Sequence, residues 1–248
     1  MAKYAIIGGT GFEEWLGLKI NRQETVNTPY RYVQFPITYG MLVDIPVIFL
    51  SRHGPAHITP PHQVNYRANI WALKEAGVTH VVAINAVGGI TVDAHPGAIL
   101  IPDQVIDYTW GRSHTFYEVE SNELVHTDFT YPYDTCLRAQ LLAVGRRVNI
   151  PLIANGTYGA CQGPRFETAA EINRLEKDGC NVVGMTGMPE ASLAREVSLA
   201  YAACCMVVNW AAGRGGKVIS MEDITVVLKE SAEKVRFLLS EFLQELHR

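Results

Sequence analysis

Residues suited to binding an anion follow two apolar runs near the start of the chain. Thr10 stands among glycines in IIGGTGFEE, and IPVIFLSRHG ends in Arg52 and His53. Backbone amides, a hydroxyl, a guanidinium and an imidazole all suit a phosphate group. The glycines can equally form an ordinary tight turn, so GGTG alone leaves both interpretations open. The motif lacks the third glycine of a dinucleotide fingerprint and the Gly-Lys-Ser/Thr of a P-loop, which disfavours a nicotinamide-dependent oxidoreductase.

Polar residues also follow the later apolar runs. NAVGG spans Asn85 to Gly89, GMTGMPE spans Gly184 to Glu190, and VVNWAAG stops its apolar run at Asn209. In open α/β sheets, ligands bind in the crevice outside the carboxyl ends of the strands. We therefore predict that these groups converge on one pocket, although each motif is also explicable as a glycine-rich turn.

The segment GPRFETAAEI places an aromatic ring, Phe166, and a carboxylate, Glu167, at the entry to a predicted helix. Phe166 also suits a buried core, and an acid such as Glu167 is favoured in the first turn of a helix. The segment by itself therefore indicates either a ligand contact or a purely structural role.

Two further histidines, His57 and His62, raise the possibility of a metal site. No carboxylate or cysteine near them completes a ligand set, and the surrounding prolines indicate an irregular loop. We expect solvated loop histidines and no bound metal.

The elements that must position these residues follow from short apolar runs bounded by glycine or proline. The runs are KYAIIGG, IPVIFLSRHG, THVVAINAVGG, GAILIPDQVIDY, IPLIANGTYGA, CNVVGMTG and YAACCMVVN. Their continuous apolar character indicates strands covered on both faces. Helical patterns occur in VNYRANIWALKEAG, PYDTCLRAQLLAVGRRVN and TAAEINRLEKDG, and an amphipathic helix over residues 220–248 closes the chain. We predict a single-domain, three-layer α/β fold over residues 1–248, with an irregular loop from about Thr109 to Tyr133.

Composition and charge narrow the class of partner. The net charge is −4 and no stripe of Lys and Arg alternates with aromatic residues, so nucleic-acid binding is not expected. No segment approaches the roughly 18 apolar residues of a membrane span. Five cysteines without a C-x-x-C pair, together with the lack of a secretion signal, indicate reduced thiols in a cytoplasmic protein. A small-molecule partner is expected.

Taken in order, these motifs resemble the trimeric purine nucleoside phosphorylase and methylthioadenosine phosphorylase family over nearly the whole chain. The most specific of them are VNYRANIWALK and MTGMPE. The resemblance implies a mixed, largely buried central sheet and a pentosyltransferase of purine salvage that needs no metal or other cofactor. In the family's reaction, inorganic phosphate attacks the anomeric carbon of a purine nucleoside and the purine leaves. The resemblance also implies a homotrimer, possibly a hexamer, with sites near its interfaces.

The resemblance also suggests a role for individual residues. Asn209 and His53 are the expected catalytic residues, and Phe166 and Met185 are expected to pack against the base and the ribose. His126, in ELVHTDF, resembles the histidine that a neighbouring subunit contributes near the 5' group. The residues expected at phosphate are Thr10, Arg52, His53, Ala86 through its backbone amide, and Thr186.

Differences between this sequence and the two branches of the family indicate which purine base it binds. Methylthioadenosine phosphorylases that resemble this chain usually carry two aspartates where it reads Asn209-Trp210-Ala211, and a small hydroxyl residue in place of Glu167. The 6-oxopurine phosphorylases resemble it in having both the Glu and the Asn. A carboxylate accepts a hydrogen bond from N1–H of hypoxanthine but faces a lone pair at N1 of adenine. Glu167 and Asn209 together therefore predict a 6-oxopurine.

At the sugar end, Met221 stands where the 6-oxopurine phosphorylases resembling this chain have a histidine for the 5'-hydroxyl, with Ile224 one turn on. Apolar side chains favour a methylthio group over a hydroxyl. The combination predicts phosphorolysis of S-methyl-5'-thioinosine to hypoxanthine and 5-methylthioribose 1-phosphate. The alternatives are a methylthioadenosine phosphorylase, an inosine/guanosine phosphorylase, and a purine-binding protein without activity.

Overall fold

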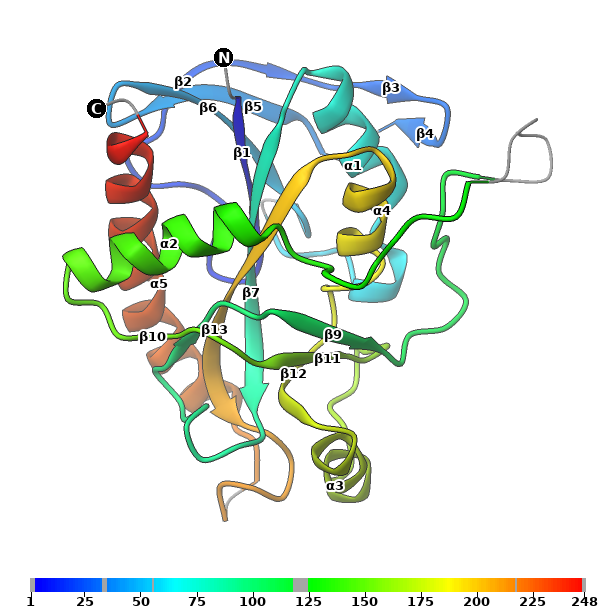
Figure 1. Cartoon of the computed structure of the whole chain (residues 1–248), viewed down its shortest axis with the longest axis vertical. Helices are drawn as coiled ribbons and strands as arrows, with labels where there is room; N and C mark the ends of the chain where they lie inside the picture. The colour runs from blue at the N-terminus through cyan, green and yellow to red at the C-terminus, as the bar shows by residue number, and fades with distance from the viewer. Residues whose placement is uncertain (1–2, 33–34, 55, 118–124, 217, 247–248) are drawn as a thin grey trace.

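The computed structural model describes residues 3–32, 35–54, 56–117, 125–216 and 218–246, and within them eleven strands form one mixed sheet (Figure 1). The strands of this sheet are β1 (Tyr4–Gly8), β2 (Lys19–Glu24), β5 (Ile37–Leu42), β6 (Ile45–Ser51), β7 (His80–Gly89), β8 (Ile99–Leu100), β9 (Gln104–Asp107), β10 (Leu152–Ile153), β11 (Thr157–Ala160), β12 (Cys180–Gly184) and β13 (Ala200–Trp210). Two short strands, β3 (Asn27–Thr28) and β4 (Arg31–Tyr32), pair separately. The helices are α1 (Tyr66–Glu75), α2 (Thr135–Arg147), α3 (Ala169–Lys177), α4 (Glu190–Glu196) and α5 (Met221–Glu245), with a 3-10 turn at Pro61–Gln63.

The centre of the sheet is parallel. β1 lies between β6 and β7, and β13 lies on the other side of β7, all in parallel register. β5 pairs antiparallel with β2 and with β6, and β12 pairs antiparallel with β7 but parallel with β11. The carboxyl ends of β1, β6, β7 and β13 therefore share one edge, at the lower end of the molecule in Figure 1. This edge is where an open α/β sheet binds its ligands.

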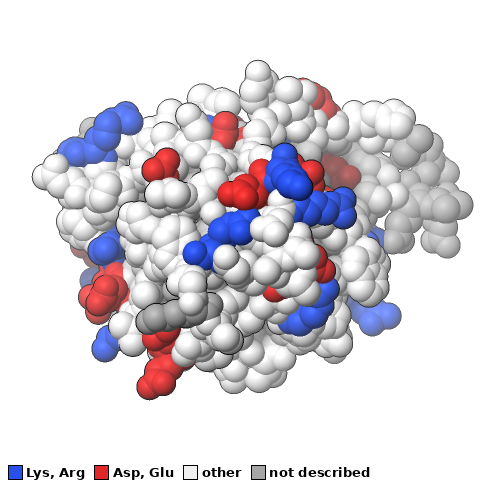
Figure 2. Space-filling model, turned by 90° about the horizontal axis from the view of Figure 1, so that it is seen from below, with Lys and Arg blue, Asp and Glu red and all other residues white. Residues whose placement is uncertain are grey.

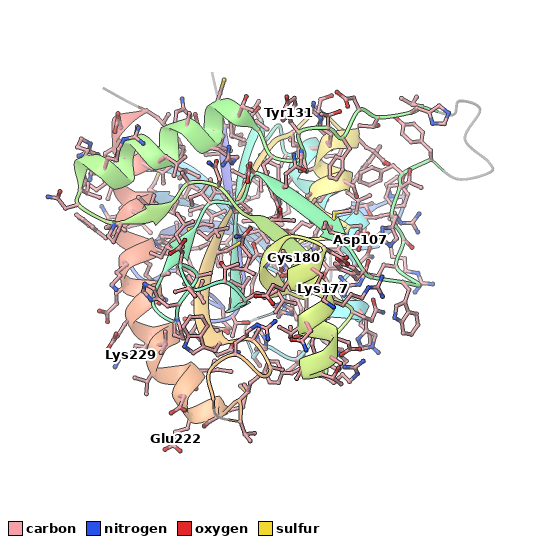
Figure 3. The ribbon with its side chains drawn as sticks, turned by 60° about the horizontal axis from the view of Figure 1, so that its bottom comes forward. Asp107, Tyr131, Lys177, Cys180, Glu222 and Lys229 are labelled. Atoms are coloured by element: carbon pink, nitrogen blue, oxygen red, sulfur yellow. The ribbon has the colours of Figure 1, made fainter. Side chains whose placement is uncertain are left out.

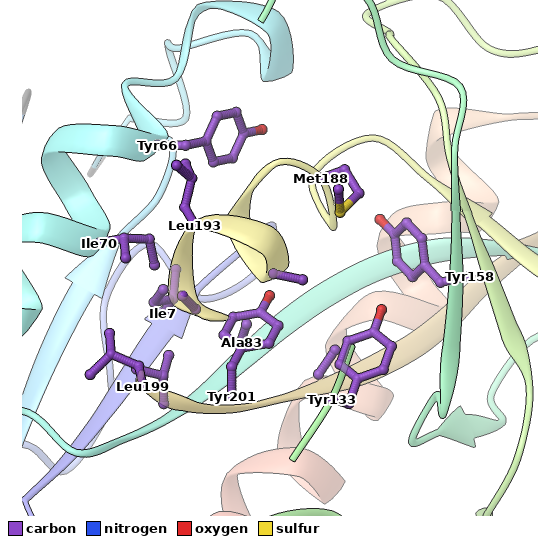
Figure 4. Close-up of a cluster of buried hydrophobic side chains, with 14 of the residues drawn as sticks. Ile7, Tyr66, Ile70, Ala83, Tyr133, Tyr158, Met188, Leu193, Leu199 and Tyr201 are labelled. Carbon is purple, nitrogen blue, oxygen red and sulfur yellow. The ribbon is translucent and has the colours of Figure 1, made fainter. Parts of the chain in front are cut away.

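Helices cover both faces of the sheet and make three layers. α1 and α4 lie on one face, α2 and α5 on the other, and α3 lies at the lower end beside β12 (Figure 1). Adjacent residues of β1 belong to opposite cores: Ile7 packs in one cluster with Ile70 and Leu193 (Figure 4), whereas Ile6 packs in the other with Leu239. The predicted three-layer α/β fold with a buried mixed sheet is confirmed.

The sequence also misplaced or missed some elements. GAILIPDQVIDY was expected to be one strand but forms β8 and β9, because Pro102 has no N–H for a ladder. β2 was missed because it is an exposed edge strand and has no buried run to reveal it. α4 was missed because its seven residues are too few for a helical period to show. In the described parts of the loop from Thr109 to Tyr133 there is neither helix nor strand, as predicted.

The helix ends are fixed by side chains of the expected kind. Ser220 accepts a hydrogen bond from the backbone N–H of Asp223 at the start of α5, and Thr168 and Glu171 form a reciprocal capping box on α3. These caps fix the first turns of α3 and α5, which carry or adjoin predicted site residues. None of the helices in the described residues is both long and apolar enough to cross a membrane.

Candidate active site

A cavity of about 580 Å³ opens at the edge where the parallel strands end. It is lined by every residue that the sequence placed in the site except His126. Thr10 comes from the loop after β1, Arg52 and His53 from the loop after β6, and Ala86 from β7. The volume lies within the usual range for a small-molecule site. Seen from this end, Figure 2 shows a largely uncharged surface on which Lys and Arg lie beside Asp and Glu.

Arg52, which the sequence placed at the phosphate, is paired with a carboxylate of its own chain. Its guanidinium is 1 % exposed and donates twice to Glu190, at 2.7 Å to each carboxylate oxygen, and once to the Ile84 carbonyl at 2.9 Å. Tyr201 also donates to Glu190, at 2.9 Å. Burial alone would lower the pKa of Arg52, but the adjacent carboxylate outweighs it and the pKa is raised. The phosphate end therefore holds a neutralised ion pair with two guanidinium N–H groups left over.

His53 is a neutral group at the same end. Its side chain is buried, and its Nδ1 lies 2.7 Å from the Thr59 carbonyl oxygen, so Nδ1–H donates and Nε2 carries the lone pair. Burial, reinforced by the charge of Arg52, lowers the pKa of His53 to about 4. The imidazole therefore suits an acceptor role toward a protonated phosphate oxygen, rather than that of a second cation.

This environment predicts a pH-dependent stability. The unfolded chain takes up a proton at His53 near pH 6.5 and the folded chain only near pH 4. Acidification through this window therefore favours unfolding. Between pH 7.5 and pH 5, wild type should lose about 2 kcal/mol more free energy of unfolding than His53→Gln, measured by urea denaturation at both pH values. Equal losses in the two proteins would show that His53 is not buried as a neutral group.

Thr186 is held by two buried residues, Asn85 and Tyr158, of which the sequence singled out only Asn85. Asn85 Nδ2 donates to Thr186 Oγ1 at 2.8 Å, which leaves the hydroxyl hydrogen free to point elsewhere. Tyr158 Oη accepts the backbone N–H groups of Thr186 and Gly187, each at 3.3 Å. Asn85 is the polar residue of NAVGG that was predicted to reach the pocket, but it lies inside β7 and contacts the lining residue Thr186 without lining the cavity itself. Its Oδ1 has no partner within the described residues.

Glu167 and Asn209, the residues expected at the base, both line the cavity, and an irregularity in β13 accounts for the position of Asn209. The pairing of β13 with β7 shifts register between Val207 and Asn209, so the consecutive residues Val208 and Asn209 both line the cavity. Such a bulge re-aims a side chain at the end of a strand. One N–H of the Asn209 amide donates to the Trp210 carbonyl at 2.7 Å, so a second N–H and the amide oxygen remain for a ligand. Burial raises the pKa of Glu167, against the lowering effect of hydrogen bonds that include the Cys161 thiol.

The cavity lining also includes apolar side chains from α5. Ile224 is buried and Met221 is 63 % exposed. Glu222, between them in sequence, points away from the fold (Figure 3). Phe166, at 42 % exposure, lies on the rim of the cavity. His126 is exposed on the loop before α2 and does not line the cavity, so its expected contribution to a neighbouring subunit stays a prediction.

His57 belongs to the cavity lining, although the sequence indicated only a solvated loop. Its ring lies 4.4 Å from that of His53, centroid to centroid, and its Nδ1 lies 3.4 Å from the Glu13 carboxylate. It thus joins the loop after β6 to the loop after β1. Within the described residues, no three His, Cys, Asp or Glu side chains are grouped as metal ligands.

Comparison with known proteins places this geometry in a family. Residues 3–244 match the family model described as the Phosphorylase superfamily. A probable S-methyl-5'-thioinosine phosphorylase from Pseudomonas syringae is 49% identical over 98% of this chain and 99% of its own length. The 6-oxopurine nucleoside phosphorylase of Pyrococcus furiosus is 43% identical over 95% of this chain and 89% of its own.

A solved structure agrees with the sequence relatives. Methylthioadenosine phosphorylase from Schistosoma mansoni, in complex with adenine, superimposes with a TM-score of 0.94 at 31% identity. The match covers 100% of this chain and 92% of that one. The resemblance drawn from the motifs is confirmed, and the chain belongs to the Phosphorylase superfamily.

Proposed function

We propose that the protein catalyses phosphorolysis of S-methyl-5'-thioinosine, giving hypoxanthine and 5-methylthioribose 1-phosphate. The observation that carries the proposal is one cavity whose lining includes both the polar pair Glu167 and Asn209 and the apolar pair Met221 and Ile224. The first pair suits a 6-oxopurine and the second a methylthio group. The relatives from Pseudomonas syringae and Pyrococcus furiosus, a probable S-methyl-5'-thioinosine phosphorylase and a 6-oxopurine nucleoside phosphorylase, support the same class of base.

In the proposed reaction, a phosphate oxygen forms a bond to the anomeric carbon as the bond from that carbon to N9 of the purine breaks. The electron pair of the broken bond passes to the purine. Thr10, Thr186 and the remaining N–H groups of Arg52 would hold the phosphate, with the lone pair of His53 Nε2 accepting from its hydroxyl. Holding the nucleophile beside the cation-like sugar lowers the barrier by orientation and by electrostatics.

The departing base gains negative charge, which the polar end of the cavity can stabilise. The Glu167 carboxylate would accept from N1–H and the second N–H of Asn209 would donate to O6 or N7. The hydrogen bond that Asn209 donates strengthens as charge accumulates, so it favours the transition state over the bound nucleoside, whereas Glu167 serves to recognise N1–H of the base. An amide does not release its proton, so a water molecule would supply the proton at N7.

The activity is tested by incubating the protein with S-methyl-5'-thioinosine with and without phosphate. Hypoxanthine and a methylthiopentose phosphate should form only when phosphate is present. A nucleoside that is bound but not cleaved would indicate a binding protein and contradict the proposal.

A second assay, with inosine as the nucleoside, tests the residues expected at the sugar. Met221→His should raise kcat/KM for inosine about tenfold, because a hydrogen-bonding partner for the 5'-hydroxyl replaces an apolar one.

The raised pKa of Glu167 predicts how base selectivity responds to pH. The ionised carboxylate repels the N1 lone pair of adenine, whereas the protonated carboxyl can donate to it. Because burial moves this protonation to higher pH, lowering the pH toward 5 should raise kcat/KM for methylthioadenosine relative to methylthioinosine. The ratio cancels the ionisation of phosphate, which both reactions share. A ratio that does not change with pH would remove Glu167 protonation from the account.

We also propose a cytoplasmic homotrimer in which His126 of one subunit approaches the sugar end of its neighbour. The exposed position of His126 outside its own chain's cavity supports this assembly. Light scattering should give about three times the chain mass of 27.4 kDa, and a monomer would contradict it.

A further inference from the structure

One arginine that the sequence did not single out, Arg112, makes an unusually complete set of hydrogen bonds behind the cavity. It lies in the loop after β9, is partly buried, and does not line the cavity itself. Its Nη1 donates to the carbonyls of Met185 at 2.9 Å and Met188 at 2.6 Å. Its Nη2 donates to the carbonyls of Cys161 at 3.3 Å and Gln162 at 2.8 Å. Both amino groups of the guanidinium are therefore used on backbone oxygens.

The acceptors belong to the two loops that meet at the cavity. Residues 161–168, here called the purine loop, carry Phe166 and Glu167. Residues 185–189, here called the phosphate loop, carry Met185 and Thr186. Arg112 connects the start of the first loop to both ends of the second. This side chain therefore adds to the backbone hydrogen bond from Cys161 N–H to the Gly184 carbonyl, which joins the two loops where they leave β11 and β12.

Two further contacts extend the connection. Nε of Arg112 donates to the side-chain oxygen of Gln162 at 3.2 Å, which also accepts from the backbone N–H of Trp110. Nη1 lies 3.4 Å from Tyr66 Oη, which donates to the carbonyl of Pro61 in the cavity wall. Through these contacts the same guanidinium reaches the loop that follows His53.

The chemistry of the acceptors distinguishes Arg112 from an ordinary ion pair. All of its hydrogen-bond acceptors within the described residues are carbonyl, amide or hydroxyl oxygens, and none is a carboxylate. Only a planar guanidinium offers five donors in a fixed plane, whereas a lysine offers three from one point. The arrangement therefore requires the shape of the group as well as its charge.

We propose that Arg112 is a positioning residue for phosphorolysis, which fixes the purine loop against the phosphate loop so that phosphate and nucleoside lie in line for reaction. The inference rests on the proposed function of the cavity. A misplacement of the reactants by about 1 Å costs on the order of 100-fold in rate. Loss of Arg112 should therefore lower kcat far more than it weakens the binding of either substrate alone.

The test compares Arg112→Ala and Arg112→Lys with wild type, using phosphate and S-methyl-5'-thioinosine. We expect kcat to fall about 100-fold in Arg112→Ala and by less in Arg112→Lys, with each KM changed less than about fivefold. Added guanidinium ion should restore part of the activity of Arg112→Ala, because it can occupy the same carbonyl cage. Rescue should be weaker with ammonium ion, which lacks the planar fork.

Arg138→Ala is the matched control. Arg138 also binds only backbone carbonyls, those of Ile101, Pro102 and Ala154, and does not line the cavity. This variant should lose stability without a comparable fall in kcat or any rescue by guanidinium. If Arg112→Ala keeps kcat within about twofold, or loses it without rescue while still folded, the positioning role is wrong.

Two measurements keep the outcomes separate. If Arg112→Ala does not fold, the kcat of Arg112→Lys decides, and a value equal to wild type overturns the proposal. Wild type that cleaves no nucleoside in the presence of phosphate would overturn the proposed function itself. Wild type that prefers another nucleoside leaves the Arg112 comparison intact with that nucleoside.

Discussion

Replacing Glu167 by serine should lower kcat/KM for S-methyl-5'-thioinosine about 100-fold while leaving that for methylthioadenosine unchanged or higher. In the proposed site, the partly buried carboxylate would accept N1–H of a 6-oxopurine, and a hydrogen bond to a charged group contributes about 1.5 to 3 kcal/mol. The same carboxylate faces the lone pair of adenine N1, so its removal relieves a repulsion. Steady-state kinetics with both nucleosides at saturating phosphate measure the two effects together.

Glu167→Gln supplies the matched control for size. Its amide oxygen can still accept N1–H, but it carries no charge. The kcat/KM of Glu167→Gln for the 6-oxopurine nucleoside should therefore lie between the values of wild type and Glu167→Ser. Relative kcat/KM values that stay at the wild-type ratio in both variants would show that Glu167 does not select the base.

The second large effect is expected at Glu190, which neutralises Arg52 beneath the phosphate end. Glu190 is fully buried, so Glu190→Gln leaves the guanidinium buried without a counter-charge. Breaking a buried pair on one side destabilises by about 3 to 5 kcal/mol. For a chain of this length, that corresponds to a fall in Tm of about 6 to 20 °C by calorimetry.

A double variant separates the loss of a charge from the loss of packing. Arg52→Met combined with Glu190→Leu removes both charges and should recover most of the stability, since apolar replacements of buried pairs are often neutral. The same variant should lose activity, because the two spare N–H groups of Arg52 are gone. Glu230→Gln, at an exposed position on α5, should change neither Tm nor activity. A double variant as unstable as Glu190→Gln would contradict the ion-pair explanation.

The parts of the fold that sequence reasoning predicted well are those with a strong local signal. Continuous apolar runs identified β1, β6, β7, β12 and β13, and residues at or after the ends of these strands line one cavity. The runs broken by proline and the exposed β2 carry no such signal. Which strands lie next to each other depends on contacts between distant parts of the sequence. The order of the motifs therefore could not predict that β12 pairs antiparallel with β7.

The site was predicted as a set of residues but not as a set of charges. Arg52 was expected at the phosphate, but no motif indicated a partner for it, and only the fold brings Glu190, 138 residues later, against it. Burial of His53, together with the neighbouring charge of Arg52, makes its imidazole neutral. Arg112 was missed because it stands in an irregular loop, where no periodicity points to a contact. The charge state of a side chain, and the contacts made by residues such as Arg112 that do not line the cavity, are set by the assembled fold.

The most direct test of the account is a competition in one vessel. Equal concentrations of S-methyl-5'-thioinosine and methylthioadenosine are incubated with phosphate and the wild-type protein, and released hypoxanthine and adenine are separated by chromatography. The initial ratio of the two bases gives the ratio of kcat/KM directly. The cavity predicts hypoxanthine in excess by on the order of 100-fold or more. Adenine released as fast as hypoxanthine, or faster, would contradict the assignment of Glu167 and Asn209 to a 6-oxopurine.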